Sequence, residues 1–469
     1  MMKKSLLIHP ALLASIAGFA APPPNIVIIF NDDQGYQDLG CYGSPDIKTP
    51  RVDQLAQEGM RFTDFLVASP VCSPSRASLL TGLYPHKAGV RGVFFPNRGY
   101  HGLAPSQVTI AETLRDVGYA TAAVGKWHLG DHVDFLPTNQ GFDSYFGIPY
   151  SNDMYPAQDM RYAADCIYLE GETPETIRQS FEEELRRGNP VAMRDKVPLM
   201  RDEECIEFPA DQRTITRRYA DAGIRFIRDS VDSGKPFFLY LANTMPHVPL
   251  FSSEPFTGNS ERGPYGDVIE EIDFYTGRIL DCLEALGIEE NTIVIFTSDN
   301  GPWLTKGEEG GSADPLFEGK FSGFEGGHRV PCIIRWPGKI PAGSVCAEIT
   351  STIDFHPTLA GLAGAELPAI ELDGKDVLDL WLAKEGAESP HEYFFYVHRG
   401  QAVRSGDWKY HLKEVFPVKA TAREYTGPSL YNLRDDIGEA NNVITEYPEV
   451  AERLSAQLDA FLSDWAKEE

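Results

Sequence analysis

Short apolar runs that alternate with amphipathic segments constrain this sequence most. Four runs are rich in β-branched or aromatic residues and have the length of buried strands: residues 25–30, 119–124, 236–241 and 292–297. Helical patterns lie between them, and we expect helices over residues 52–59, 110–117, 211–232 and 265–286. This alternation predicts an α/β fold with a large, mostly parallel sheet that is flanked by helices on both faces. Ligands of such sheets bind beyond the carboxyl ends of the strands.

The pattern changes after residue 365. We expect three antiparallel strands and a closing helix in the remainder: residues 392–397, 402–411 with a turn at Gly406, 430–433, and 450–465. The chain therefore divides into a large N-terminal domain over residues 21–365, which we expect to be the catalytic domain, and a smaller C-terminal α+β subdomain with an antiparallel sheet over residues 366–469.

The first twenty residues have the pattern of an export signal. Lys3 and Lys4 precede a mostly apolar stretch over residues 6–19, and small residues surround a possible cut after Ala20. A buried first helix is the alternative reading. No other apolar run reaches the roughly 20 residues that a membrane-spanning helix needs. We therefore expect residues 1–20 to be a signal peptide, with no integral membrane segment, and the protein to be exported to the periplasm or the extracellular space.

Charge and cysteine content narrow the possible partners. The chain has 42 Lys and Arg against 69 Asp and Glu, a formal net charge of −27, which argues against nucleic acid as a partner. A locally basic site for a small anion is still compatible with this charge. The seven cysteines are an odd number, so six could form up to three disulfides or stay partly free. None has the CxxC spacing of a zinc site.

Cys72 stands at the head of the most informative motif, Cys-Ser-Pro-Ser-Arg followed by Ala-Ser-Leu-Leu-Thr-Gly. Pro74 and Ser75 suit the beginning of a helix, which places Cys72 at the helix N-terminus, where backbone N–H groups attract an anion. Arg76 lies one turn further and can fold back onto the same spot. We expect a thiol in this position to have a lowered pKa. A buried structural cysteine is the alternative for an isolated residue.

The motif resembles the signature of the type I sulfatases, without a mismatch. The likeness continues in residues 25–43, 125–130, 298–302 and 325–338, in the order of that family, and residues 147–151 (GIPYS) resemble arylsulfatase A and its relatives. The resemblance implies the alkaline phosphatase-like sulfatase fold. It also implies that Cys72 is oxidised to 3-oxoalanine (formylglycine), whose hydrated aldehyde is the nucleophile, by a formylglycine-generating enzyme or maturase.

Two polar pairs follow two of the predicted strands. Asp32 and Asp33 come after residues 25–30, and Asp299 and Asn300 come after residues 292–297. Four oxygen ligands at two strand ends suit a hard divalent ion. A turn or helix cap is the alternative for either pair alone. By resemblance these four residues, with modified Cys72, hold Ca²⁺; ligand type alone does not distinguish Ca²⁺ from Mg²⁺.

Further polar side chains follow other strands, and the resemblance implies their roles. Lys126 and His128 follow residues 119–124, on a turn at Gly125, and match a sulfate contact and a base toward the formylglycine hydroxyl. His247, between two prolines, matches the family histidine that contacts sulfate and protonates the leaving oxygen. Lys320 matches the lysine near the bridging oxygen, and Ser151 a serine that touches sulfate. Each of these types, taken alone, is more often structural or solvated.

The substrate implied by export and by this likeness is a sulfated saccharide, with galactose or N-acetylgalactosamine sulfate favoured. Candidates for the sugar subsite lie near the matched blocks or in the subdomain: Asp153, Trp303, His328, His398 and Arg404. A structural or surface role is an equal alternative for each. Two other functions compete: a phosphate or phosphonate monoester hydrolase of the same superfamily, and a non-catalytic sulfoglycan-binding protein in which Cys72 stays a thiol.

Overall fold

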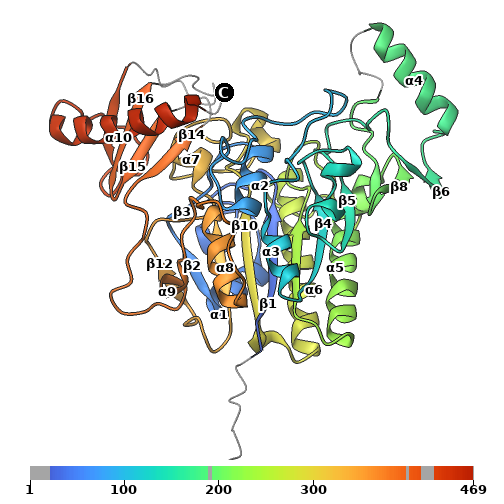
Figure 1. Cartoon of the computed structure of the whole chain (residues 1–469), viewed down its shortest axis with the longest axis horizontal. Coiled ribbons are helices and arrows are strands. Elements are labelled where there is room, and N and C mark those ends of the chain that lie inside the picture. The colour runs from blue at the N-terminus through green and yellow to red at the C-terminus, as the bar shows by residue number, and fades with distance from the viewer. Residues whose placement is uncertain (1–21, 188–192, 398–400, 414–426, 468–469) are drawn as a thin grey trace, which may run out of the picture.

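The computed structural model describes residues 22–187, 193–397, 401–413 and 427–467. The predicted signal peptide and His398 lie outside these described residues. An eleven-stranded sheet passes through the middle of the molecule. The C-terminal sheet lies on one side of it, and the segment that carries α4 (Pro174–Arg187) lies on the other (Figure 1).

The centre of the large sheet is parallel, as the apolar runs predict. Its five strands are, in spatial order, β10 (Thr292–Ser298), β1 (Asn25–Asn31), β9 (Phe237–Ala242), β4 (Ala120–Lys126) and β5 (Ser144–Ile148). All four neighbouring pairs run parallel. β1, β9 and β10 are buried along their whole length, which explains why they are continuously apolar rather than alternating.

The flanks of this sheet are mixed, so the prediction of a mostly parallel sheet holds for its centre. One flank consists of β11 (Cys332–Arg335), β2 (Met60–Phe62) and β12 (Ser344–Cys346); the other consists of β7 (Leu199–Arg201), β8 (Glu204–Phe208) and β6 (Tyr162–Tyr168). β11 is antiparallel to both its neighbours, and so is β7. Three of these strands have only three residues, too few to show a period.

β4 departs from its predicted end. The sequence predicts a turn at Gly125, but the strand continues, and Lys126 pairs with Ile148 of β5. Gly125 adopts φ 108°, which favours glycine, and a Cβ there would stand 1.8 Å from the carbonyl oxygen of Ala242. The glycine therefore allows close approach of two strands, and Lys126 becomes the last residue of β4.

Helices cover both faces of the sheet. Ile26, Ile28 and Phe30 of β1 contribute to the core under one set of helices, and Val27 and Ile29 to the core under the other. The first set is α2 (Cys72–Thr81), α3 (Ile110–Asp116) and α8 (Phe355–Ala363); the second is α1 (Pro50–Glu58), α5 (Ile215–Asp232) and α6 (Pro264–Ala285).

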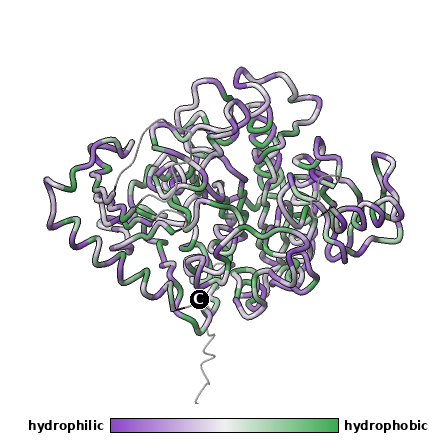
Figure 2. Tube along the Cα trace, turned by 90° about the horizontal axis from the view of Figure 1, so that it is seen from above, coloured by the Kyte–Doolittle hydropathy of each residue, from purple (hydrophilic) through white to green (hydrophobic). Residues whose placement is uncertain are grey.

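Apolar segments concentrate in the interior and hydrophilic ones at the periphery (Figure 2). Among the described residues, no helix combines the length and the apolar character needed to cross a bilayer.

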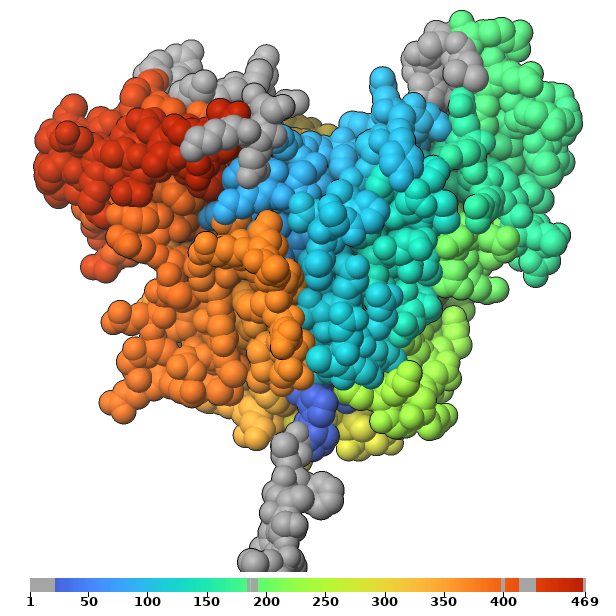
Figure 3. All heavy atoms as spheres, in the orientation of Figure 1, coloured from blue at the N-terminus to red at the C-terminus, as the bar shows by residue number. Residues whose placement is uncertain are grey.

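The C-terminal subdomain is a four-stranded antiparallel sheet under a long helix. Its elements are β14 (Phe394–Val397), β15 (Gln401–Ser405), β16 (Trp408–Lys413), β17 (Ser429–Asn432) and α10 (Pro448–Lys467). The turn predicted at Gly406 is present, with φ 56°, and it separates β15 from β16, so the subdomain has four strands where three were expected. In Figure 3 the upper rim of the molecule is hollowed between this subdomain and the segment with α4.

The subdomain joins the main body through short connecting elements. β13 (Thr350–Ser351) pairs with β3 (Phe65–Leu66), and α9 (Leu378–Trp381) lies in the chain between α8 and β14. All seven cysteines lie in the described residues, where each is a free thiol.

Candidate active site

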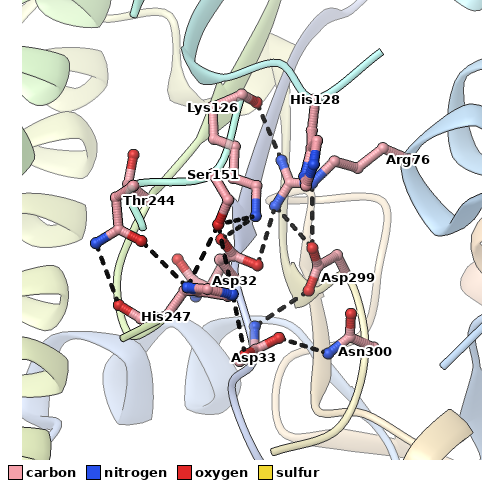
Figure 4. A network of polar contacts seen from close by, with 12 residues as sticks. Asp32, Asp33, Arg76, Lys126, His128, Ser151, Thr244, His247, Asp299 and Asn300 are labelled. Atoms are coloured by element: carbon pink, nitrogen blue, oxygen red, sulfur yellow. Dashed lines mark hydrogen bonds and ion pairs between the residues drawn. The ribbon is translucent and has the colours of Figure 1, made fainter. Parts of the chain in front are cut away.

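Three carboxylates meet where β1 and β10 end. Asp32 and Asp33 follow β1, Asp299 follows β10, and one oxygen from each lies within 4.8 Å of the others. The cause is the parallel register, which places Asn31 opposite Ser298 and so brings the two following turns together. Figure 4 shows other site residues converging on these carboxylates. Their grouping, predicted from the two strand ends, is present in the structure.

Unsatisfied oxygens at this cluster fit a cation. Asp32 Oδ1 and Asn300 Oδ1 are buried without a hydrogen-bond partner, whereas the Asn300 Nδ2 group donates to Asp33 Oδ1 at 2.8 Å. Buried oxygens normally have a hydrogen-bond partner, so these two atoms are available to a ligand, although Arg76 Nη2 lies 3.6 Å from Asp32 Oδ1 as an ion pair. Three carboxylates and one amide oxygen form an all-oxygen set of the kind that Ca²⁺ or Mg²⁺ prefers.

Arg76 binds these carboxylates from the first turns of α2. Its Nε and Nη2 donate to Asp299 Oδ2 at 3.1 and 2.8 Å, and its Nη1 donates to the Lys126 carbonyl at 3.0 Å. Burial raises the pKa of Asp299, and the charge of Asp32 raises it further, while the nearby cations oppose both effects. Arg76 therefore anchors a carboxylate that is costly to bury, rather than presenting a free guanidinium to an anion.

Cys72 is the first residue of α2 and is 3% exposed, so its predicted position at a helix N-terminus is present in the structure. The prediction of a lowered thiol pKa is wrong. Burial raises the pKa of Cys72; the positive charges of Lys126 and Lys320 act in the opposite direction but do not outweigh it. This environment therefore does not favour a reactive thiolate at Cys72. If residue 72 is the nucleophile, a group other than the thiolate must attack.

Two lysines lie against the carboxylates. Lys126 Nζ donates to Asp32 Oδ2 at 2.5 Å and to Ser151 Oγ at 3.3 Å. Lys320 Nζ donates to both oxygens of Asp33, at 2.6 and 2.9 Å. Burial alone would lower the pKa of Lys320, but Asp33, together with smaller contributions from Cys72, Asp32 and Asp299, outweighs it and raises the pKa above its usual value. The Lys320 ammonium group is therefore held in the charged form.

His128 has one free ring nitrogen. Its Nε2 lies 3.1 Å from the Phe94 carbonyl, which can only accept, so Nε2 carries a proton. Its Nδ1 is buried and has no partner. Burial lowers the pKa of His128 well below its usual value, and Lys126 and Arg76 lower it further. The side chain is therefore a neutral imidazole whose Nδ1 lone pair is unused. Its backbone φ of 62° lies in the left-handed region, as does that of Asp33 at 66°.

His247 lies on the opposite side of the cluster, beside Ser151 (Figure 4). Its Nε2 lies 3.8 Å from Asp33 Oδ2, and Ser151 Oγ lies 3.4 Å from each ring nitrogen. Burial and the charge of Lys320 lower its pKa, and the carboxylates of Asp33 and Asp32 act in the opposite direction. The structure therefore brings together the six side chains predicted to contact sulfate or the nucleophile: Arg76, Lys126, His128, Ser151, His247 and Lys320.

Asn152 and Gln212 are polar residues at this site that the sequence reasoning missed. Asn152 Oδ1 lies 3.1 Å from His247 Nδ1, and Asn152 Nδ2 donates to Gln212 Oε1 at 3.1 Å. Both side chains are buried. Asn152 lies just beyond a strand, between Ser151 and Asp153, which were both predicted as site residues. Its position in the sequence therefore could have identified it. Gln212 is sixty positions away, and its position in the sequence could not have identified it.

Two of the candidates for the sugar subsite adjoin the cluster. Burial raises the pKa of Asp153, but His247, Lys126 and a hydrogen bond from Ser151 outweigh it and hold the pKa below its usual value. The Trp303 ring centroid lies 5.6 Å from that of His247 and 4.8 Å from Lys320 Nζ. A second cation, Lys306 Nζ, lies 4.2 Å from the same centroid. Trp303 thus contacts the reactive side chains directly.

Arg404 and His328 lie elsewhere, in the junction with the C-terminal subdomain. Arg404 is 4% exposed, and its guanidinium forms a two-pronged ion pair with Asp64 and a hydrogen bond to the Gly406 carbonyl. His328 is fully buried, with Nδ1 2.8 Å from the Val67 carbonyl. Their placement near a sugar, predicted from closeness in sequence to matched blocks, is not what the structure shows. Each is engaged within the protein, so neither lines the cluster.

Comparison with known proteins decides the family. Residues 24–365 match the family model for Sulfatase, and residues 315–464 match the model for the C-terminal part of N-sulphoglucosamine sulphohydrolase. The chain belongs to the sulfatase family. It is a type I, arylsulfatase A-like sulfatase, a sulfuric ester hydrolase with the alkaline phosphatase-like fold.

Relatives match this sulfatase over most of its length. Arylsulfatase A of Bos taurus is 39% identical, over 97% of this chain and 91% of the relative. N-acetylgalactosamine-6-sulfatase of Canis lupus familiaris is 38% identical, over 86% of this chain and 74% of the relative. Among solved structures, Ps i-CgsB in complex with k-i-k-neocarrahexaose is 30% identical with a TM-score of 0.75, over 94% of this chain and 92% of that one.

Proposed function

We propose that this sulfatase removes O-sulfate from carbohydrate, with a galactose or N-acetylgalactosamine sulfate of a glycan as substrate. Its nucleophile would be formylglycine made from Cys72, beside a Ca²⁺ ion, for which Mg²⁺ could substitute. Two relatives support the carbohydrate class by their names, one an N-acetylgalactosamine-6-sulfatase and one crystallised with a neocarrahexaose. Residues 1–20 support export to the periplasm or beyond, and Cys72 would need a maturase as a partner.

One observation carries this proposal. A modifiable residue, Cys72, begins α2 beside a buried carboxylate trio and two lysines, all within a single polar cluster. Its thiol pKa is raised by burial, so the unmodified side chain is a poor nucleophile there. The surroundings suit an anionic ester, because the ammonium groups of Lys126 and Lys320 lie against the carboxylate cluster beside residue 72.

When present, a divalent cation would neutralise sulfate oxygens and lower the pKa of the nucleophilic hydroxyl at residue 72. The chain's own residues do the rest. Lys126 and Lys320 would bind the sulfate oxygens, exchanging part of their contact with Asp32 and Asp33 for contact with the ester. Ser151, which already accepts from Lys126, would hold a further oxygen.

The two histidines suit opposite proton transfers. His128 has an unused Nδ1 lone pair and would accept a proton at residue 72. His247 would donate a proton from Nε2 to the oxygen of the departing alcohol. Asp153 and Trp303, which adjoin His247, are the two remaining candidates for contact with the sugar on that side.

The first experiment is the mass of the tryptic peptide that contains Cys72, from protein made in its native host, together with hydrolysis of sulfated monosaccharides. We expect a peptide in which the thiol has been replaced by an aldehyde, and release of sulfate from a galactose or N-acetylgalactosamine sulfate. Cys72→Ala, made in the same host, should lose at least ~10⁴-fold in kcat, because the nucleophile is absent.

Other outcomes favour the competing functions. A modified enzyme that hydrolyses a phenyl phosphate faster than the matching phenyl sulfate would support a phosphate or phosphonate monoester hydrolase. An unmodified thiol, with sulfated glycan bound but not hydrolysed, would support the binding protein. Normal turnover by Cys72→Ala would exclude the proposed nucleophile.

A further inference from the structure

The hydrogen-bond partners of Gln212 determine which way its amide faces. Its nitrogen Nε2 lies 3.2 Å from the Asn152 carbonyl and 3.1 Å from the Asp195 carbonyl. Backbone carbonyls only accept hydrogen bonds, so the NH₂ end of the amide must face them. The opposite atom, Oε1, is therefore an acceptor that faces Asn152.

The same argument then orients Asn152. Its Nδ2 lies 3.1 Å from Gln212 Oε1 and 2.9 Å from the Pro249 carbonyl, both of which are acceptors. The NH₂ end of Asn152 must therefore face Gln212 and Pro249. Its remaining atom, Oδ1, faces His247 Nδ1 at 3.1 Å.

His247 Nδ1 consequently has two acceptors at short distance, whereas the Ser151 hydroxyl lies farther away, at 3.4 Å. The Val248 carbonyl lies 2.6 Å from this nitrogen, in addition to Asn152 Oδ1. A ring nitrogen between two acceptors is stabilised only when it carries a proton. In the neutral ring the other nitrogen, Nε2, then holds the lone pair, and it is the nitrogen nearer Asp33, at 3.8 Å.

We propose that Asn152, oriented by Gln212, is a positioning residue that holds His247 as the Nδ1–H tautomer and directs Nε2 at the leaving oxygen of the substrate. This inference rests on the proposed function. Before this step the Nε2 lone pair takes a proton from solvent, which gives the imidazolium. As the oxygen at residue 72 bonds to sulfur, the bond between sulfur and the leaving oxygen breaks and its electron pair goes to that oxygen. The leaving oxygen takes the proton from Nε2, and the ring returns to its Nδ1–H form. In this role Asn152 contacts neither the substrate nor the proton that is transferred. It acts only through its hydrogen bond to the ring of His247.

The consequence depends on the leaving group. A sugar alkoxide is strongly basic and needs the proton from Nε2, whereas 4-nitrophenolate can leave without one. Loss of Asn152 should therefore slow carbohydrate sulfates much more than 4-nitrophenyl sulfate. A merely structural role for Asn152 would slow both esters alike.

The experiment compares kcat on a sulfated sugar and on 4-nitrophenyl sulfate for N152L, which keeps the shape and removes the acceptor. We expect a loss of about 10–100-fold on the sugar ester, and less than about threefold on the aryl ester. The matched control is N25L. Asn25 is also buried and hydrogen-bonded, but it lies at the amino end of β1, far from His247 in the fold, so its ratio of the two rates should equal that of the wild type. Equal losses on both esters in N152L would overturn the proposal.

A second measurement needs no turnover. In wild-type protein labelled with ¹⁵N-histidine, NMR spectra should show a protonated Nδ1 and an unprotonated Nε2 for His247, assigned by comparison with His247→Gln. A protonated Nε2 in the neutral ring would overturn the proposal, even if N152L does not fold. Wild-type protein that hydrolyses neither ester would count against the proposed function, and the tautomer would still be decided by NMR.

Discussion

Asp354 is a buried carboxylate that joins three separate segments of the chain. It accepts hydrogen bonds from the backbone N–H of Ser351 at 2.8 Å and of Lys375 at 2.9 Å. Its third partner is His391 Nε2, 2.8 and 3.0 Å from the two carboxylate oxygens. Burial by itself lowers the pKa of His391, but the charge of Asp354 and its hydrogen bond to the ring together outweigh burial and raise the pKa above the usual value.

This pair predicts a pH-dependent contribution to stability. A histidine whose pKa is raised by folding stabilises the native state fully below its unfolded value of about 6.5, and the contribution is lost as the pH rises through the folded pKa. We therefore expect the free energy of unfolding to fall as the pH rises from about 6.5 through the folded pKa of His391.

His391→Gln, which can still donate to Asp354 but does not titrate, isolates this contribution. Urea unfolding midpoints at several pH values should show a shallower fall for the variant than for the wild type. Parallel curves for the two proteins would contradict the assignment.

Much of the site was predictable because its residues follow strands that are recognisable in the sequence. Asp32, Asp33, Asp299 and Asn300 directly follow β1 and β10, whose continuous apolar runs are clear. Those positions indicate a ligand site by fold geometry alone. The roles of the lysines and histidines needed the family resemblance, because one lysine or histidine after a strand has many structural uses.

The site predictions that the structure does not support concern contacts between segments that are distant in the sequence. Arg404 was expected at the substrate, but its partner Asp64 is 340 positions away, and no local pattern reveals the pair. The thiol pKa of Cys72 was expected to follow the helix N-terminus, whereas the residue is 3% exposed and burial has the larger effect. Burial of a single residue depends on the packing of the whole domain, which its neighbours in sequence do not encode.

The short helix α7 (Glu325–His328) connects the C-terminal sheet to the active site. Glu325 accepts from Tyr396 Oη at 2.6 Å and from Lys409 Nζ at 3.0 Å, so β14 and β16 both hold this helix. On its other side, the Gly327 carbonyl accepts from the N–H of Gly301 at 3.1 Å, next to Asn300. The C-terminal sheet thereby supports the turn that carries one of the candidate cation ligands.

Lys409→Met should reveal the energy of this junction. The side chain of Lys409 is fully buried, and it lies 3.0 Å from Glu325 and 3.1 Å from Glu439. Removing its charge leaves carboxylates under-compensated in the interior, and we expect a loss of about 3–5 kcal/mol in the free energy of unfolding. The measurement is the urea midpoint and slope, followed by fluorescence.

Lys384→Met provides the matched control for this prediction. Lys384 pairs with Asp379 at 2.6 Å, but the two side chains are 55% and 65% exposed. Such a pair contributes about 0–1 kcal/mol, so this variant should unfold almost like the wild type. If both variants unfold at the same urea concentration, the junction does not contribute as proposed.

The strands differ in how well the sequence predicts them. β1, β9 and β10 are predicted to within one residue at each end, because burial on both faces produces an uninterrupted apolar run. The flanking strands β2, β7 and β12 have three residues each and were not predicted, since so short a segment has no detectable period. Their pairing depends on the edge that the central strands offer.

The carboxylate cluster also links distant parts of the whole molecule. Asp32 and Asp33 follow the first strand of the chain, Asp299 comes more than 260 residues later, and Lys320 lies in the segment that leads to the C-terminal sheet. A cation held by Asp32, Asp33 and Asp299 would relieve repulsion among buried like charges. It would also bind the native state alone, because the unfolded chain does not bring these residues together.

Chelation should therefore lower the thermal stability of the whole protein. A ligand at a hundredfold excess over its Kd stabilises the folded state by about 2.7 kcal/mol, so removing Ca²⁺ with EGTA should lower the Tm by several degrees, and added Ca²⁺ should restore it.

Asp299→Asn should abolish this Ca²⁺-dependent shift. Asp267→Asn is the control: Asp267 accepts three backbone N–H bonds from residues 258–260, away from the cluster, so the variant should keep the full shift even if its Tm is lower. The measurement is differential scanning fluorimetry with and without EGTA. A wild-type Tm that responds neither to EGTA nor to EDTA, which also removes Mg²⁺, would mean that the cluster is stabilised by Lys126, Lys320 and Arg76 alone, and that no cation is part of the folded enzyme.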